Sequence, residues 1–192
     1  MNRLEELERL VRGLYEAKHE DRADWCDYLY ENHVFIVDSF AREVSETMEV
    51  NPELARAAAM LHDIADAEMS RFADAHEERS KEIAREFLET AEFTQDEIAV
   101  IVDDGIELHG CYDGNRPKSV EGQIFATADA LAHINSDFYP HVFNTLMADE
   151  SEADRRAWVG KKIQRDFEHK ICFDEMRENT RTRYEELVEK YT

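Results

Sequence analysis

The sequence has few residues that break helices or cross-link chains, and few basic side chains. Its 192 residues include three prolines, six glycines and three cysteines, and 23 lysines and arginines stand against 45 aspartates and glutamates. The formal net charge of −22 argues against nonspecific binding to nucleic acid polymers or anionic membranes, because such binding needs basic surfaces. An acidic, solvated surface is the ordinary interpretation. A polyanionic substrate stays open, since bound cations can reverse the local sign of charge.

The cysteines and the apolar runs indicate the cellular setting. Cys26, Cys111 and Cys172 lie far apart and form no CxxC pair, a usage typical of a reducing cytoplasm. The N-terminal stretch MNRLEELERLVRGL is charged throughout and lacks an apolar segment of signal-peptide length. No apolar run approaches the roughly 20 residues that a membrane helix needs. We therefore expect a soluble cytoplasmic protein.

Proline and glycine, which break helices, are scarce, and apolar residues recur mostly at helical spacing. No segment shows a convincing strand-type alternation. The sequence predicts one all-α domain over residues 1–192, an irregular helical bundle with a motif-bearing core at about 25–140 and a helical tail at about 150–192. Helices are expected at about 24–48 and 76–90. Local patterns that predict helix starts are Asn51 before Pro52, a Thr94–Glu97 capping box, and caps at Ser119 and Ser151.

The stretch AAAMLHDIADAE (57–68) ends an apolar, alanine-rich helix on His62 and Asp63, side by side. Adjacent side chains on a helix point about 100° apart, so this pair does not share a face. Both side chains could still reach one point in a cleft beside the helix end. A neutral imidazole with a carboxylate is a donor set that suits a divalent metal.

Further candidate ligands lie in unusual surroundings. His33 interrupts the apolar helical segment ENHVFIVDSFA, and Asp129 lies inside the apolar run IFATADALAHI, where a charge is costly unless it is paired or ligated. His76 begins one predicted helix and His109 ends another. His133 shares a helix face with Asp129, although we favour an ordinary helix residue there. Taken singly, each histidine could be a hydrogen-bonded core or surface residue, and Asp129 could pair with an arginine.

The ordered set H…HD…D resembles the HD-domain superfamily of metal-dependent phosphohydrolases, with a helical fold that holds metal between helices. The segment AAAMLHDI resembles the family's apolar helix running into its doublet. HEERSKEIAREFL and KSVEGQIFATADAL resemble segments of a branch of small stand-alone bacterial and archaeal hydrolases. The resemblance covers about residues 25–140. It implies that His33, His62, Asp63 and Asp129 bind a divalent metal ion, which could be Mn, Fe, Co, Ni or Mg.

The reaction that the resemblance implies is hydrolysis of a phosphomonoester or phosphoanhydride in a small molecule, most simply a nucleotide. Metal-bound water would attack phosphorus, with Asp63 and Asp66 as catalytic residues. Asp66, one turn after Asp63, would orient the water or act as a general base; the alternative is a solvated acid at a helix end. His76 and His109 match the order of second-metal ligands in some relatives, so one metal is expected and two are allowed. Otherwise His76 caps its helix and His109 lines the pocket.

Basic residues that hold phosphate are expected in loops beside the site, with Arg116 and Lys118 placed best and Arg79 less well. An ordinary surface role is an equal alternative for each of them. Many relatives carry a basic residue three positions after the first histidine, where this chain has Ile36, and this departure weakens the inference of a nucleotide. Two alternatives remain, a non-catalytic metal- or ligand-binding regulatory module and a di-iron oxygenase on the same fold.

The chain after Asp149 carries no motif that predicts chemistry. We expect this tail to cover the core or to form a subunit contact, so a homo-oligomer is allowed. The expected partner is a small phosphorylated substrate, and neither a nucleic acid polymer nor a membrane is expected.

Overall fold

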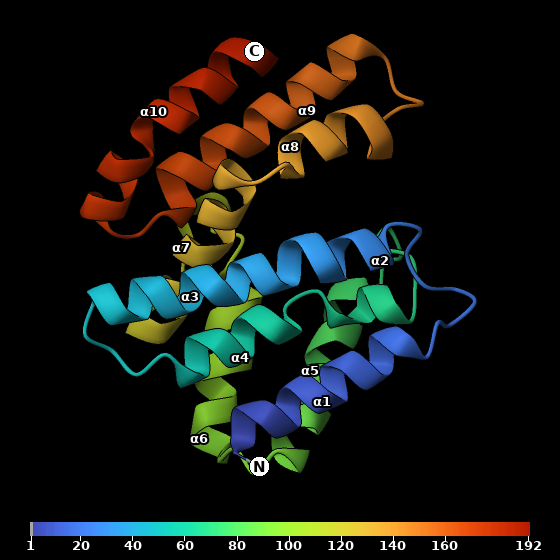
Figure 1. Ribbon diagram of the computed structural model, residues 1–192, viewed down its shortest axis with the longest axis vertical. Coiled ribbons are helices and arrows are strands. Elements are labelled where there is room, and N and C mark those ends of the chain that lie inside the picture. Colours follow the sequence, from blue (N-terminus) through green and yellow to red (C-terminus); the bar gives the residue numbers. More distant parts are fainter. Residues whose placement is uncertain (1) are drawn as a thin grey trace.

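A computed structural model describes residues 2–192, and these residues form helices and connecting segments without a β-strand. Figure 1 shows the arrangement of the α-helices. They are α1 (Arg3–Glu16), α2 (Cys26–Leu29), α3 (Phe35–Thr47), α4 (Glu53–Leu61), α5 (His76–Thr90), α6 (Gln95–Ile98), α7 (Val120–Asn135), α8 (Phe138–His141), α9 (Glu152–Arg165) and α10 (Asp174–Tyr191). The all-α prediction is therefore confirmed.

Shorter helical segments join or extend these α-helices. Two of them are 3₁₀ turns, η2 (Ile64–Ala67) and η4 (Tyr112–Gly114). Four are π-helical, η1 (Tyr30–Val34), η3 (Ala99–Ile106), η5 (Val142–Leu146) and η6 (Asp166–Lys170). The helix expected at about 24–48 is thus α2, η1 and α3 in succession. π-helical segments are rare and frequent at functional sites, and η1 carries His33.

Three α-helices begin at the side chains that were expected to cap them. The Thr94 hydroxyl accepts the backbone N–H of Glu97 at 3.3 Å, within a complete capping box. Ser119 Oγ accepts the N–H of Gly122 at 3.0 Å, and Ser151 caps α9 in the same way. Helix α4 begins at Glu53, one residue later than expected, and Asn51 Oδ1 accepts its N–H at 3.1 Å. Local side-chain chemistry therefore sets these boundaries.

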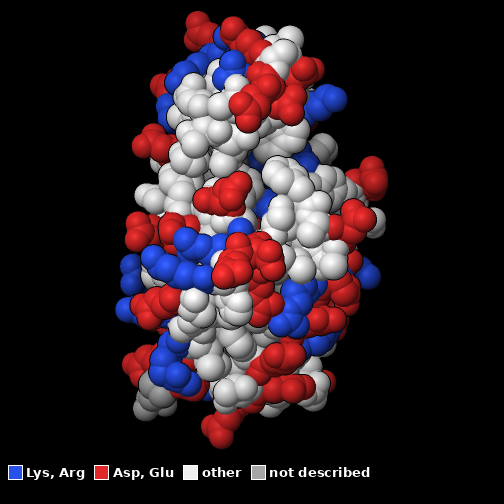
Figure 2. All heavy atoms as spheres, turned by 90° about the vertical axis from the view of Figure 1, so that its right-hand side faces the viewer, with Lys and Arg blue, Asp and Glu red and all other residues white. Residues whose placement is uncertain are grey.

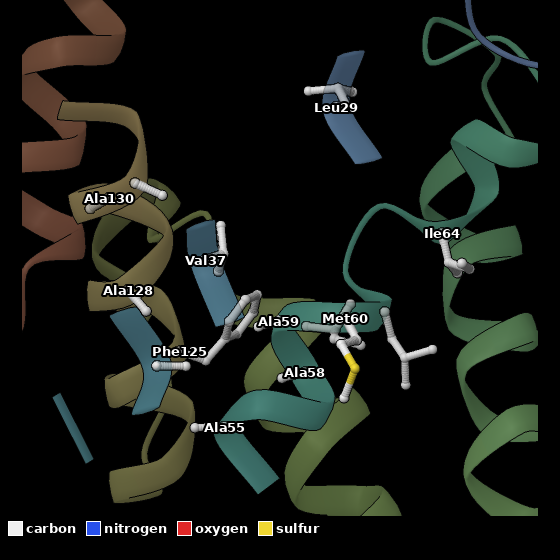
Figure 3. Close-up of a cluster of buried hydrophobic side chains, with 14 of the residues drawn as sticks. Leu29, Val37, Ala55, Ala58, Ala59, Met60, Ile64, Phe125, Ala128 and Ala130 are labelled. Carbon is white, nitrogen blue, oxygen red and sulfur yellow. The ribbon is translucent and has the colours of Figure 1, made fainter. Parts of the chain in front are cut away.

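The centre of the molecule is built from small side chains on α3, α4 and α7. Val37, Ala59 and Phe125 are fully buried and come from these three helices, and Figure 3 shows them gathered in one cluster. Small alanine side chains allow helices to approach closely. From Ile124 to Ile134 every residue of α7 is buried, as expected for a helix surrounded on all sides. Helix α7 therefore places Asp129 in the interior.

The C-terminal tail shares this interior. The hydrophobic core includes Leu7 near one end of the chain and Tyr191 near the other. In Figure 1, α8, α9 and α10 form the upper part of the molecule, α1, α4, α5 and α6 form the lower part, and α3 crosses between them. Val159 and Ile163 bury one side of α9. Among residues 2–192, no helix has both the length and the apolar character needed to cross a membrane.

Candidate metal centre

Three of the four expected metal ligands converge in the interior. His33 comes from η1, His62 from the C-terminal cap of α4, and Asp129 from α7. One potential ligand atom from each lies within 4.8 Å of the others. His33 Nε2 is 3.3 Å from His62 Nε2 and 3.2 Å from Asp129 Oδ1. The structure therefore brings together donor atoms from segments that are far apart in the sequence.

The hydrogen bonds made by these residues leave atoms at the centre of the group that could bind a metal ion. The Nδ1–H of His62 donates to the carbonyl of Ala59 at 2.9 Å, so in the neutral ring Nε2, which faces His33, is the nitrogen with the lone pair. Within residues 2–192, Asp129 Oδ1 is buried without a hydrogen-bond donor. A buried carboxylate oxygen beside two imidazole nitrogens is costly unless a cation or a proton satisfies it. The donor set thus fits a divalent metal ion.

The fourth expected ligand, Asp63, lies beside this group and contacts a cation. Its Oδ2 is 3.3 Å from His62 Nε2 and forms an ion pair with Arg71 at 2.6 Å. Burial acts to raise the pKa of Asp63, but Arg71 and His62 outweigh burial and hold that pKa well below its usual range. Asp63 is therefore a carboxylate anion at the end of α4.

Asp66, an expected catalytic residue, is fully buried one turn further on. Its carboxylate accepts hydrogen bonds from Arg71 and from His76 Nε2, the latter at 2.8 Å. Asp66 is not among the residues that line the neighbouring cavity. These contacts indicate that Asp66 positions Arg71 and His76. Its role as a general base stays a prediction.

A cavity of about 1000 Å³ opens from the three-ligand group. Figure 2 shows a hollow between the upper and lower parts of the molecule, with basic side chains recessed in it. Every π-helical segment contributes to the cavity wall, η1 through His33, η3 through Ile106, η5 through Leu146 and η6 through Lys170. The departures from α-helical geometry thus coincide with the candidate site.

The two histidines expected as second-metal ligands both line this cavity. His109 Nδ1–H donates to the carbonyl of Ile106 at 2.6 Å, and its ring centre lies 5.7 Å from that of His62. Burial, assisted by Lys170, lowers the pKa of His109 to about 4, so its imidazole is neutral. Neither His109 nor His76 belongs to the three-ligand group. A second metal at these residues stays a prediction.

The basic residues expected to hold phosphate lie elsewhere. Arg79 forms ion pairs with Glu68 at 2.8 Å and Glu82 at 3.1 Å. Arg116 and Lys118 belong to the loop before α7, where the Lys118 backbone N–H donates to a neighbouring carboxylate. None of these three basic residues is among those that line the cavity. Their contact with substrate stays a prediction.

Several charged residues at the site were not found from the sequence. Lys170 Nζ donates to Asp129 Oδ2, and Arg71 joins Asp63 to Asp66. The tail beyond Asp149, which showed no motif, supplies Lys170 and a basic face of α9 to the cavity. The sequence pattern that could have pointed to them is the spacing of Lys161, Lys162 and Arg165 on one helix face. This pattern is common on solvated helices, so it does not by itself predict a binding site.

His133 is also more than an ordinary helix residue, so the interpretation favoured from the sequence was wrong. It is buried, its Nε2 is 3.5 Å from Asp129 Oδ1, and its Nδ1 is 2.9 Å from Asp166 Oδ2. Burial lowers the pKa of His133 to about 3 despite both carboxylates. His133 is therefore a neutral ring that links the metal-ligand candidate on α7 to η6.

Opposite charges nearly balance in this buried cluster. The carboxylates are Asp63, Asp66, Asp129 and Asp166, and the cations are Arg71, Lys162 and Lys170. Burial acts to raise the pKa of Asp129, but His133, Lys170 and His33 together hold it well below its usual range. Arg165, 3.9 Å from Asp166 Oδ1, adds a fourth cation, so four carboxylates face four basic side chains. Asp129 Oδ1, which has no hydrogen-bond donor among residues 2–192, is the position where a metal cation has the favourable sign.

Comparison with known proteins agrees with this geometry. The family model of the HD domain matches residues 30–134, which is more than half of the chain and includes His33, His62, Asp63 and Asp129. A comparison with curated proteins and one with solved structures found no match. The family match and the three-ligand group support a metal-dependent hydrolase as the general class of activity.

Proposed function

The chain belongs to the HD domain family, and from that premise we propose that it is a divalent-metal-dependent phosphohydrolase acting on a nucleotide. The reaction is hydrolysis of a phosphomonoester or of a phosphoanhydride. The observation that carries the proposal is the convergence of His33, His62 and Asp129 around a buried carboxylate oxygen that lacks a hydrogen-bond donor among residues 2–192.

His33, His62, Asp63 and Asp129 would hold the metal ion. When bound, a divalent ion lowers the pKa of water and polarises a phosphoryl oxygen. The carbonyl of Ala59 keeps His62 oriented with Nε2 inward. Arg71 lines the cavity between two carboxylates, where its guanidinium can donate to phosphoryl oxygens. His76 and His109 line the same cavity and are the residues that would hold a second ion.

The nucleotide is proposed because of the size and aromatic lining of the cavity. A volume of about 1000 Å³ is at the upper end for small-molecule sites and far exceeds a phosphate group. Trp25, Phe72, Tyr112 and Trp158 line it, and Phe72 is 87% exposed. Trp25 and Phe72 lie nearly parallel with ring centres 6.5 Å apart. Exposed aromatic faces of this kind favour stacking with a base.

The test is phosphate release from a panel of nucleotides and phosphoesters with Mn, Co, Ni, Mg and Fe in turn. We expect release that requires metal, and Asp129→Asn should lower it by at least about 100-fold together with bound metal, since even residues that only support ligands cost about 10–100-fold. Asp103→Asn, which removes a surface partner of Arg85, is the matched control and should retain activity.

Other outcomes would replace the proposal. Protein that retains metal but releases no phosphate from any compound would be a regulatory or ligand-binding module. Protein that holds close to two irons per chain and consumes oxygen with an organic substrate would be an oxygenase. Elemental analysis and oxygen measurements on the same preparation distinguish these two cases.

A further inference from the structure

One wall of the cavity is basic and comes from outside the span that matches the HD domain. Trp158, Lys161, Lys162 and Arg165 line the cavity from α9. Their spacing of three, four and seven residues after Trp158 places them on one helix face. Lys170, on η6, also lines the cavity, and its Nζ donates to Asp129 Oδ2. The C-terminal helices therefore add cations to a cavity whose metal ligands come from the family core.

Two of these cations have no strong partner in a chain that is rich in acids. Most arginine side chains have a carboxylate oxygen within hydrogen-bond distance, yet Lys161 makes no hydrogen bond or ion pair within residues 2–192. For Arg165 the nearest carboxylate oxygen is Asp166 Oδ1, 3.9 Å from Nε. Arg165 Nε is also buried without a hydrogen-bond partner. A buried donor left unsatisfied in this way is costly, so Arg165 Nε indicates a missing acceptor, and the exposed Lys161 adds an unpaired positive charge beside it.

Asp166 makes no hydrogen bond to Arg165, because the groups closest to its carboxylate lie at Oδ2, while Oδ1 faces Arg165 at 3.9 Å and has no hydrogen-bond partner among residues 2–192. Tyr139 Oη donates to Asp166 Oδ2 at 2.6 Å, and His133 Nδ1 lies 2.9 Å from the same oxygen. Lys162 Nζ is 3.3 Å from it. Lys162, Lys170 and Arg165 all lie within 4.0 Å of the Asp166 carboxylate and share its negative charge. Arg165 makes no hydrogen bond to it, so its guanidinium, like the ammonium of Lys161, can still bind an anion in the cavity.

The guanidinium of Arg165 is held in place by an aromatic ring. Its central carbon lies 4.4 Å from the centre of the Tyr112 ring, which also lines the cavity. Stacking of this kind limits the orientations of the planar guanidinium. A fixed guanidinium offers paired N–H donors that match two oxygens of a phosphate. Lys161, one turn earlier on α9, adds a second positive charge on the same face.

We propose that Lys161 and Arg165 form an anion subsite that binds a second phosphate of the substrate, while the phosphate that reacts lies at the metal ligands. This inference rests on the proposed function and narrows its substrate to compounds with at least two phosphates. Lys170 and Lys162 connect the two positions, because they pair with Asp129 and Asp166 respectively. The two phosphates would occupy one continuous cavity.

The experiment measures binding of inorganic pyrophosphate to the metal-free protein by titration calorimetry, so it requires neither metal nor turnover. We expect Arg165→Gln to raise the dissociation constant about tenfold, which corresponds to about 1.4 kcal/mol. Lys161→Gln, an exposed position that should not disturb folding, should raise it about threefold. Lys190→Gln removes an exposed lysine without a carboxylate partner among the described residues and should bind like the parent protein.

Hydrolysis of nucleotides supplies a second measurement in the metal-loaded enzyme. Arg165→Gln should raise the KM of a nucleoside diphosphate about tenfold and leave that of the monophosphate within about twofold, because only the diphosphate reaches α9. Equal effects on both substrates would place Arg165 at the reacting phosphate and overturn the proposal. Unchanged pyrophosphate binding in Arg165→Gln, or no binding by the parent protein, would also overturn it. Arg165-dependent binding without any hydrolysis would retain the subsite and refute the proposed function instead.

Discussion

Replacement of Lys170 by methionine tests whether the buried charges stabilise one another. Lys170 is 2% exposed, its Nζ donates to Asp129 Oδ2, and it lies 4.0 Å from Asp166 Oδ1. Burial acts to lower the pKa of Lys170, but these two carboxylates outweigh burial and raise it, so the residue is charged. Methionine approximates the volume and removes the charge. Asp129 and Asp166 then remain buried with one cation fewer.

Removing one partner of a buried ion pair costs about 3–5 kcal/mol. We expect Lys170→Met to lower the free energy of unfolding of the metal-free protein by this amount. For a chain of this size about 2–4 °C is lost per kcal/mol, so Tm should fall by ~6–20 °C. Added Mn²⁺ should shrink the deficit, because an ion at Asp129 would replace part of the missing positive charge.

Urea denaturation followed by circular dichroism gives the free energy of unfolding with EDTA and with Mn²⁺. Lys81→Met is the matched control, because Lys81 pairs with Glu78 and Glu107 at the surface and such pairs contribute about 0–1 kcal/mol. A loss below about 1 kcal/mol in metal-free Lys170→Met would refute the reasoning about buried charge. The same deficit with and without Mn²⁺ would refute the link between Lys170 and a metal at Asp129.

Two further predictions concern stability. Arg3 pairs with Glu97 and Glu53 and so connects α1 to α6 and α4. Arg3 lowers the pKa of Glu97 from 4.5 to about 2. The stabilisation that this pair gives the folded protein is therefore present above pH 4.5 and is lost as the pH falls toward 2. Arg3→Gln should therefore cost about 1 kcal/mol at pH 7 and much less at pH 2.5, and an equal loss at both pH values in urea denaturation would contradict this. Ala128→Leu, at a fully buried position between helices, should cost about 1–3 kcal/mol through overpacking, whereas Ala148→Leu, at an exposed position, should leave Tm unchanged.

Helix boundaries were predictable where a nearby side chain sets them. Thr94, Ser119 and Ser151 each accept a backbone N–H three residues later, and α5 occupies the expected span of 76–90. The π-helical segment that carries His33 was not predictable, because the apolar spacing around it is that of an ordinary helix. Its register brings His33 within 3.3 Å of His62, a contact made with a distant part of the chain.

The sequence by itself determined the helical class, the capped starts of the helices and the identity of the candidate metal ligands. These features depend on local spacing and on residue types that appear in a recognisable order. Only the tertiary structure decided which charges meet, because side-chain burial and ion pairing depend on helices that are far apart in the chain. Lys170 and Arg165 look like ordinary residues of a charged tail, yet folding places Lys170 against Asp129 and Arg165 in the same cavity. Their importance arises from where they are buried.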